Sequence, residues 1–507
     1  MSIHTPVIVG VADVKNKTSE HKEPATLMVE AIMQAMEDSQ ISINELRSQI
    51  DSIDVVRTWT WPYADLPGLL SQKLELSKRP KWTRYTEHGG NQPAKLVDEA
   101  AGRIARGETK VAVVTGGEAL ASLAACAKAG NVEPPGWTTP VTPVEDSFSP
   151  TTVNLGQDIG GMHSIGAPIH VYPLYENAFR AHRAQSLKEN NEESAALYAE
   201  FAKVAAQKQY SWNYLKPPAS MKEIGTVSRR NRMICLPYPL LMNAFNTVNL
   251  AAAVILTSVE NARGLGVPEE KWVYPLAGAG RKEKENFWER PNFHHSEAIS
   301  TALEECLTFS GIKMDNIDAL DLYSHLGLPI LDPSKPVTLL GGLTSFGGAG
   351  NNYSMHAIAE MSRQIRSRKI NTGLILANGG VLSYQHVLCL SSRSRTASSP
   401  YPDSRVSSST VVGNSPPIEA FSEGDARIET YTVAFGRDGK PETGFIIGRL
   451  KATDSRFVAN HGDQRTLQQL ASAFEEQIGK EGYVETKCDA KGEPECNVFF
   501  LGPKSGL

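Results

Sequence analysis

The sequence lacks the features that mark membrane proteins, nucleic-acid-binding proteins and disulfide-rich secreted proteins. No apolar run approaches the roughly 18 residues of a membrane span. Lys and Arg number 51 against 56 Asp and Glu, a formal net charge of −5, so no overall basic field attracts nucleic acid or an anionic membrane. Both partners are therefore excluded from our expectations. The cysteines form no CxxC pair in this long chain, which favours a reducing compartment: Cys126, Cys235, Cys306, Cys389, Cys488 and Cys496.

Several catalytic and cofactor motifs are missing as well. The chain has no HExxH, GxSxG or Walker sequence, which removes the main support for a metalloprotease, an α/β-hydrolase or a P-loop protein. Gly278-Ala279-Gly280 lacks the third glycine and the strand-to-helix context of a dinucleotide fingerprint. The sequence therefore predicts no metal site and no permanently bound cofactor.

The two ends of the sequence carry weak targeting information. The N-terminal residues lack the basic start and long apolar stretch of a signal peptide. The last three residues, Ser505-Gly506-Leu507, are similar to the peroxisomal Ser-Lys-Leu address but lack its basic middle residue. We expect a cytoplasmic protein, with the peroxisome as the alternative.

Strand-like runs alternate with helical periodicity over most of the chain, which is typical of α/β layers. An early example is the strand-like run Val7–Val11 followed by a helix over Thr26–Glu37, in which Met28, Ile32 and Met36 fall on one face. Residues 129–171 are rich in Gly, Pro and Thr and have little periodicity, and this stretch is far longer than an ordinary connection. We expect inserted loops there, above the core.

The second half of this α/β region repeats the first. With one offset and no gap, seven of 24 aligned positions are identical, among them Ala31 and Ala298, Ile32 and Ile299, and Asp51 and Asp318. A second block aligns a Gly-rich turn and helix over residues 89–106 with another over 350–366. The sequence predicts two copies of one unit, residues 1–270 and 271–393, with a loop insertion at about 129–245 in the first copy.

The C-terminal part has a different character. Residues 394–417 are dominated by Ser, Pro and Arg and have no apolar period, which indicates an exposed linker. Residues 418–507 contain five strand-like runs and one helical run near Thr466–Ile478. We expect a small β-rich domain there, similar to an OB-fold barrel.

Two Gly-rich turns precede helices at corresponding places in the two copies. They are Gly89-Gly90-Asn91 and the turn that ends in Gly350-Asn351-Asn352. A helix N-terminus offers free N–H groups and a positive dipole to an anion or a developing oxyanion. A turn that uses glycine only for its geometry is the alternative for each one. Their symmetric placement favours a shared site.

These features together resemble the thiolase superfamily. The resemblance rests on the duplicated halves, the insertion in the first half, the run Gly341–Gly348 and the turn Asn378-Gly379-Gly380. Five further segments resemble thiolase-like proteins that carry an additional C-terminal domain: 172–180, 236–242, 321–324, 347–361 and 429–450. The resemblance implies a five-layered αβαβα core and binding of acyl-CoA thioesters, with sterol-carrier-type thiolases closer than degradative ones.

Working thiolases use a nucleophilic Cys, a His and a second Cys, and none of the three stands at its expected position in this chain. The pattern of the superfamily places the nucleophile at Gly90, the His at Gly348 and the second Cys at Ala377. A fourth thiolase motif corresponds here to Tyr323-Ser324-His325-Leu326. The superfamily chemistry therefore lacks its usual nucleophile and base.

Other polar residues remain near the pocket that the resemblance implies. We predict His88, Tyr323, Ser324 and His325 as catalytic candidates, His88 because a helix N-terminus would lower its pKa and keep it neutral as a base. A His bonded to a loop carbonyl is the structural alternative for His88. Residues predicted to contact a CoA thioester are Gly89, Gly90, Asn91, Gly348, Asn351, Asn352 and Gly379. The loop residue His163 also remains near the expected pocket. The mid-helix His356 is expected to be structural.

Two functions follow from these observations. The first is a thiolase-like acyltransferase that acts on acyl-CoA or carrier-bound thioesters without the Cys/His/Cys set, and relies on proximity and oxyanion stabilisation. The second is a non-catalytic protein that binds acyl-CoA or an acyl carrier, or is a scaffold for a partner enzyme. Pairing into a homodimer through the core sheets is an expectation that the resemblance adds.

Overall fold

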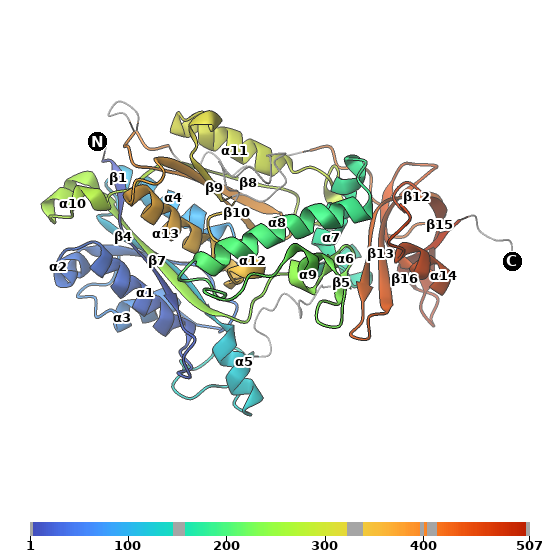
Figure 1. Cartoon of the computed structure of the whole chain (residues 1–507), viewed down its shortest axis with the longest axis horizontal. Coiled ribbons are helices and arrows are strands. Elements are labelled where there is room, and N and C mark those ends of the chain that lie inside the picture. The colour runs from blue at the N-terminus through green and yellow to red at the C-terminus, as the bar shows by residue number, and fades with distance from the viewer. Residues whose placement is uncertain (1–3, 145–157, 322–337, 396–399, 403–412, 503–507) are drawn as a thin grey trace.

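The computed structural model describes residues 4–144, 158–321, 338–395, 400–402 and 413–502. Two sheets and three layers of helices form the larger part of the molecule, and a β-rich domain lies at one end (Figure 1). From one side to the other the layers are helices, sheet, helices, sheet and helices (Figure 1). The predicted αβαβα order is confirmed.

The first sheet belongs to the first copy of the repeated unit. Its strand order is β1-β7-β4-β2-β3, in which β1 and β7 and then β7 and β4 run antiparallel, while β2 runs parallel to both β4 and β3. The strands are β1 (Pro6–Lys15), β2 (Ile50–Val55), β3 (Trp82–Tyr85), β4 (Val111–Ala119) and β7 (Asn249–Ser258). Strands β1, β4 and β7 are buried along nearly their whole length, as their continuous apolar runs predict.

The second sheet repeats this arrangement. Its order is β8-β11-β10-β9, with β8 and β11 and then β11 and β10 antiparallel and β10 parallel to β9. The strands are β8 (Tyr274–Lys282), β9 (Ala319–Asp321), β10 (Thr372–Gly379) and β11 (Tyr384–Ser391). Each of these strands occupies the place of β1, β2, β4 or β7 of the first sheet, which confirms the predicted duplication of the core.

Helices α4 (Gln92–Ala105) and α13 (Tyr353–Arg366) lie between the two sheets. Both are buried on most sides, and small residues such as Ala100, Ala101 and Ala357 allow close approach to the strands. Helix α1 (Pro24–Asp38) covers the outer face of the first sheet and α11 (Glu297–Ser310) that of the second (Figure 1). The remaining short helices of the two halves are α2 (Ile43–Ser48), α3 (Leu66–Lys73), α10 (Val259–Gly264) and α12 (Gly342–Ser345).

The insertion of the first half lies between β4 and β7. It contains more regular structure than the sequence predicts: α7 already begins at Pro168, inside the stretch for which we expected only loops. The pattern was masked because α7 carries an internal proline, Pro173. A capping box of Ser186 and Glu189 starts the long helix α8. The elements are α5 (Leu120–Lys128), α6 (Ile159–Met162), α7 (Pro168–His182), α8 (Leu187–Gln207), α9 (Met221–Gly225), β5 (Met233–Cys235) and β6 (Tyr238–Pro239).

The C-terminal domain is a closed five-stranded barrel. Strands β12, β13, β14, β16 and β15 pair in that order and β15 pairs again with β12, while β14 and β16 are parallel. Helix α14 (Gln464–Leu470) connects β14 to β15, the third and fourth strands of the domain along the chain. The predicted OB-like barrel with one helix is therefore confirmed. The strands are β12 (Gly424–Phe435), β13 (Pro441–Leu450), β14 (Arg456–His461), β15 (Glu481–Cys488) and β16 (Pro494–Leu501).

The barrel is joined to the core by more than its connecting segment. Strand β5 of the insertion pairs with β12, and Arg456 of β14 donates a hydrogen bond of 2.8 Å to the carbonyl oxygen of Trp288.

The prediction that residues 394–417 form an exposed linker is wrong for Tyr401, which is 8% exposed. Its hydroxyl donates a hydrogen bond of 2.7 Å to Asp98 of α4. A tyrosine ring can be buried wherever its hydroxyl group finds a hydrogen-bond acceptor, and the composition of the segment does not reveal that acceptor.

No helix of the described ranges is both long and apolar enough to cross a membrane.

Candidate functional site

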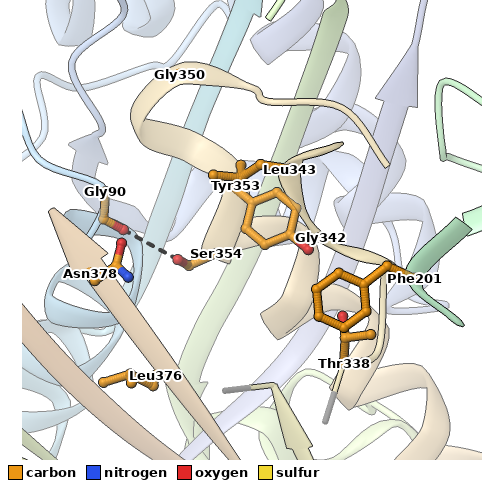
Figure 2. Close-up of a pocket in the computed structure, with 10 residues that line it drawn as sticks. All are labelled: Gly90, Phe201, Thr338, Gly342, Leu343, Gly350, Tyr353, Ser354, Leu376 and Asn378. Atoms are coloured by element: carbon orange, nitrogen blue, oxygen red, sulfur yellow. Dashed lines mark hydrogen bonds between the residues drawn. The ribbon is translucent and has the colours of Figure 1, made fainter. Parts of the chain in front are cut away.

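The two predicted Gly-rich turns meet between the sheets. The N–H of Gly89 donates to Asn351 Oδ1 at 3.0 Å, and Ser354 Oγ donates to the carbonyl oxygen of Gly90 at 3.2 Å (Figure 2). Gly379 lies against the same turn, since a Cβ built on it would be 2.7 Å from Asn91 Oδ1. Residues almost 290 positions apart in the chain thus form one site.

Asn351 fixes the position and tautomer of His88. Because Asn351 Oδ1 accepts from Gly89, its Nδ2 is the donor, to Arg57 O at 2.8 Å and to His88 Nδ1 at 3.1 Å. His88 Nδ1 therefore holds the lone pair and Nε2 the proton. Burial lowers the pKa of His88 to about 4, and the positive charge of Arg57 lowers it further while Glu87 opposes the change. His88 is neutral at physiological pH.

Gly90 and Gly348, the positions that the thiolase pattern predicts for the nucleophile and the histidine, both have a close neighbour. A Cβ on Gly90 would lie 2.2 Å from the carbonyl oxygen of Asn378, and a Cβ on Gly348 would lie 2.2 Å from Asn246 Oδ1. Real Cβ contacts essentially never fall under 3.0 Å. Gly348 also donates its N–H to Phe245 O at 2.7 Å, so this donor is already used. At Gly90 the neighbour is a backbone carbonyl, so the space that a side chain would need is closed; at Gly348 it is the end of the Asn246 side chain, which can move aside.

A small cavity of about 60 Å³ lies beside the Gly90 turn. This volume has room for a few water molecules or a small acyl group. Phe201, from α8 of the insertion, and Tyr353, from α13, both line the cavity (Figure 2). The lining residues are Gly90, Phe201, Thr338, Gly342, Leu343, Gly350, Tyr353, Ser354, Leu376 and Asn378. The insertion thus supplies part of the wall.

Polar groups near this cavity have unused hydrogen-bonding capacity. No described residue accepts from the N–H of Gly90 or Asn91, the two residues before α4. The side-chain oxygens of Asn91 and Asn352 are buried and also have no partner in the part of the chain that the structure describes. Donors at a helix N-terminus suit a carbonyl oxygen that gains negative charge. Of Gly90 and Asn91, Gly90 lines the cavity.

Glu118, near the end of β4, is a buried carboxyl that sequence analysis did not identify. Its Oε1 accepts from Trp59 N–H at 2.9 Å, and its Oε2 accepts from Thr58 Oγ1 at 2.8 Å and from Thr60 N–H at 3.0 Å. Burial raises the pKa of Glu118 to about 7, against the effect of these hydrogen bonds. A Cβ on Gly350 would lie 2.3 Å from Oε1, so the carboxyl lies behind one wall of the cavity. A charged residue that ends a continuously apolar strand is the signal that could have revealed it.

The structure separates other predicted residues from this site or does not describe them. Tyr323, Ser324 and His325 lie outside the described residues. His163 connects the insertion to the barrel, because its Nε2 accepts from Asn497 N–H at 2.9 Å. The fully buried His356 bonds to Asp13 of β1, as a structural histidine would.

The cysteines and metal-ligating residues give no alternative centre. Cys235, Cys306 and Cys389 are buried, and burial raises the pKa of each thiol, to about 12 for Cys235 and Cys389. Such thiols are poor nucleophiles. None of the six cysteines lines the described cavity. In the described ranges no group of three or more His, Cys, Asp or Glu could hold a metal ion.

One solved structure matches the chain over almost its whole length. The monomeric SCP2-thiolase-like protein type 1 from Mycobacterium smegmatis has 30% sequence identity and a TM-score of 0.80, and the match covers 99% of this chain and 100% of that one. This chain belongs to the SCP2-thiolase-like protein type 1 family. A family model for the thiolase-like protein type 1 additional C-terminal domain matches residues 409–489, which supports the same assignment.

More distant structures share the fold of the thiolase-like core. Acetyl-CoA acetyltransferase from Syntrophomonas wolfei has 15% identity, and human mitochondrial 3-ketoacyl-CoA thiolase in complex with CoA has 12%. Both have a TM-score of 0.53 and cover 77% of this chain, with 100% and 98% of their own chains matched. At these identities the likeness concerns the fold alone. Among curated proteins none matches this chain.

Proposed function

We propose that this SCP2-thiolase-like protein type 1 binds acyl thioesters, on CoA or on an acyl carrier, without forming an acyl-enzyme. The observation that carries the proposal is the contact between Gly90 and Asn378. A nucleophilic side chain at position 90 would overlap the Asn378 carbonyl oxygen, which would be 2.2 Å from its Cβ. The thiolase nucleophile is therefore both absent and excluded by its surroundings.

The described groups support binding of the thioester carbonyl. The N–H groups of Gly90 and Asn91 have no acceptor among the described residues, and the cavity of about 60 Å³ beside Gly90 suits an acetyl-sized group better than a long chain. Phe201 limits the cavity on the side of the insertion. A longer acyl chain would need α8 or its phenyl ring to move.

Cysteine-independent acyl transfer is the second candidate, and His88 favours it. With a pKa of about 4, His88 is neutral beside the Gly89-Gly90 turn, as a general base must be. Its Nδ1 lone pair, however, accepts a hydrogen bond from Asn351 at 3.1 Å, and a pKa near 4 makes it a weak base at neutral pH. Catalysis by His88 would require this hydrogen bond to be exchanged for one from the substrate.

Binding and turnover of acetyl-CoA separate the two candidates. We expect calorimetric titration to show binding, and a thiol-release assay to show no turnover above the uncatalysed rate. Turnover that is lost in His88→Ala and kept in the matched variant His21→Ala, whose exposed histidine lies in the loop before α1, would support acyl transfer instead. Absence of both binding and turnover would contradict both candidates.

The assembly state is a separate proposal. The resemblance to thiolases implies a homodimer, whereas the M. smegmatis relative is described as monomeric. By likeness to that relative we propose a monomer for this chain. Light scattering of the purified protein distinguishes the two states.

A further inference from the structure

Three lysines converge on one turn of the insertion. Lys15, the last residue of β1, donates from Nζ to Ser211 O at 2.8 Å, and Lys17 donates from Nζ to Trp212 O. Lys216 donates from Nζ to Asn213 Oδ1 at 3.0 Å. The consecutive residues 211, 212 and 213 thus each accept a hydrogen bond from a different lysine, which places the three ammonium groups along the same turn.

No carboxylate balances these three charges in the described part of the chain. The charges that act on Lys15 come from Lys17 and Lys216, and the charge that acts on Lys17 comes from Lys216. Burial, followed by this repulsion, lowers the pKa of Lys15 to about 8. The hydrogen bonds to three consecutive residues place the ammonium groups close together, where like charges repel.

A lysine next to this turn is paired with a carboxylate. Lys208, in the same segment of the insertion, bonds to Glu360 at 2.6 Å. The chain as a whole has a net charge of −5, so a surplus of acidic groups is available. None of these acidic groups is paired with the three lysines in the described part of the chain. A bound anion would neutralise their charge.

The turn also presents aromatic rings and free donors. Lys15 Nζ lies 5.1 Å from the ring centre of Tyr214, and Lys17 Nζ lies 4.8 Å from that of Trp212. Lys17 and Lys216 are exposed, and each ammonium group has three donors, of which the protein uses one or two. Ammonium groups with spare donors beside flat rings suit a phosphorylated ligand that carries an aromatic base.

We propose that Lys15, Lys17 and Lys216 form a binding site for the phosphate groups of a nucleotide-bearing ligand. The turn contacts the segment that continues from the cavity-lining residues 342 and 343: Trp212 N–H donates to Phe346 O at 2.8 Å, and Asn213 Nδ2 donates to Ser345 O at 2.8 Å. CoA carries its phosphates at the nucleotide end, remote from the thioester. The identity of the ligand as CoA rests on the proposed function; the phosphate site itself does not.

Inorganic pyrophosphate is the first probe, because it has phosphates and no thioester. We expect calorimetry at low salt to show binding by the wild-type chain, weakened about tenfold in Lys15→Gln, Lys17→Gln and Lys216→Gln. Lys188→Gln is the matched control, since this lysine of α8 is 83% exposed and lies outside the turn. Lys216 is exposed, so its variant should fold normally even if Lys15→Gln does not.

The second probes are acetyl-CoA and acetyl-pantetheine, which has the thioester and no phosphate. Acetyl-CoA should bind more weakly to the Lys216→Gln variant than to the control, while acetyl-pantetheine should bind both equally. Pyrophosphate binding without acetyl-CoA binding would support the site and contradict the proposed function. Acetyl-CoA binding that is equal in all variants, no pyrophosphate binding, or capture of an acidic polypeptide alone would overturn the phosphate site.

Discussion

Replacing Gly90 by alanine measures directly how tightly the thiolase nucleophile position is closed. The new Cβ would begin 2.2 Å from the carbonyl oxygen of Asn378, and the two atoms must separate to at least 3.0 Å. The carbonyl belongs to β10, where Asn378 pairs with Gln385 of β11, so it cannot retreat without disturbing the sheet. Overpacking of this kind costs about 1–3 kcal/mol. Gly90→Cys should be destabilised at least as much, and should not gain acyl transfer.

Gly102 offers a control in the same helix. A Cβ there would meet first the end of the Arg106 side chain, at 3.1 Å, which can move aside. Gly102→Ala removes a glycine from the interior of α4 and should stabilise the chain by up to about 1 kcal/mol. Urea unfolding should therefore shift in opposite directions for the two variants. A Gly90→Ala midpoint equal to or above that of the wild type would refute the reasoning.

Three further predictions concern the surroundings of the site. Asn351→Ala leaves the Gly89 N–H without its acceptor and should cost about 2 kcal/mol or more in urea unfolding, whereas equal stability would show that the two turns do not depend on this residue. Phe201→Ala should cost about 3 kcal/mol and should tighten binding of longer acyl-CoA chains relative to acetyl-CoA in calorimetry; unchanged chain-length preference would contradict the cavity assignment. The pKa of Glu118 is raised from 4.5 to about 7, so its contribution to stability is fully present below pH 4.5 and is lost as the pH rises through about 7. The stability of Glu118→Gln relative to wild type should therefore increase by about 3 kcal/mol between pH 4.5 and 8, and a difference that does not vary with pH would contradict this environment.

Much of the fold could be predicted because local patterns and the tertiary structure agree. The apolar run around Val111–Val114 is a buried strand, and the repeat between the two halves appears as the same strand order in both sheets. The OB-like barrel followed from five strand-like runs and one helix. Helix α7 was the exception, because its internal proline at Pro173 and the Gly-rich approach to it conceal the helical period.

The candidate site could be predicted only in part. The symmetric Gly-rich turns indicated that residues 89–91 and 350–352 form one site, and the hydrogen bond between Gly89 and Asn351 agrees with this. Two other features depend on pairings that no local pattern contains. The closure of Gly90 depends on Asn378, and the burial of Tyr401 depends on Asp98, almost 290 and just over 300 residues away. A contact that one backbone carbonyl or one side-chain hydroxyl makes with a residue far away in the chain leaves no periodic signal in the sequence.

The central claim is that the chain binds a thioester without being acylated by it. The most direct test is intact-protein mass spectrometry after incubation with acetyl-CoA, on a sample whose binding of acetyl-CoA has been measured by calorimetry. We predict saturable binding and an unchanged protein mass. An acetyl adduct that forms at a rate above chemical background and maps to a residue of the cavity would contradict the claim.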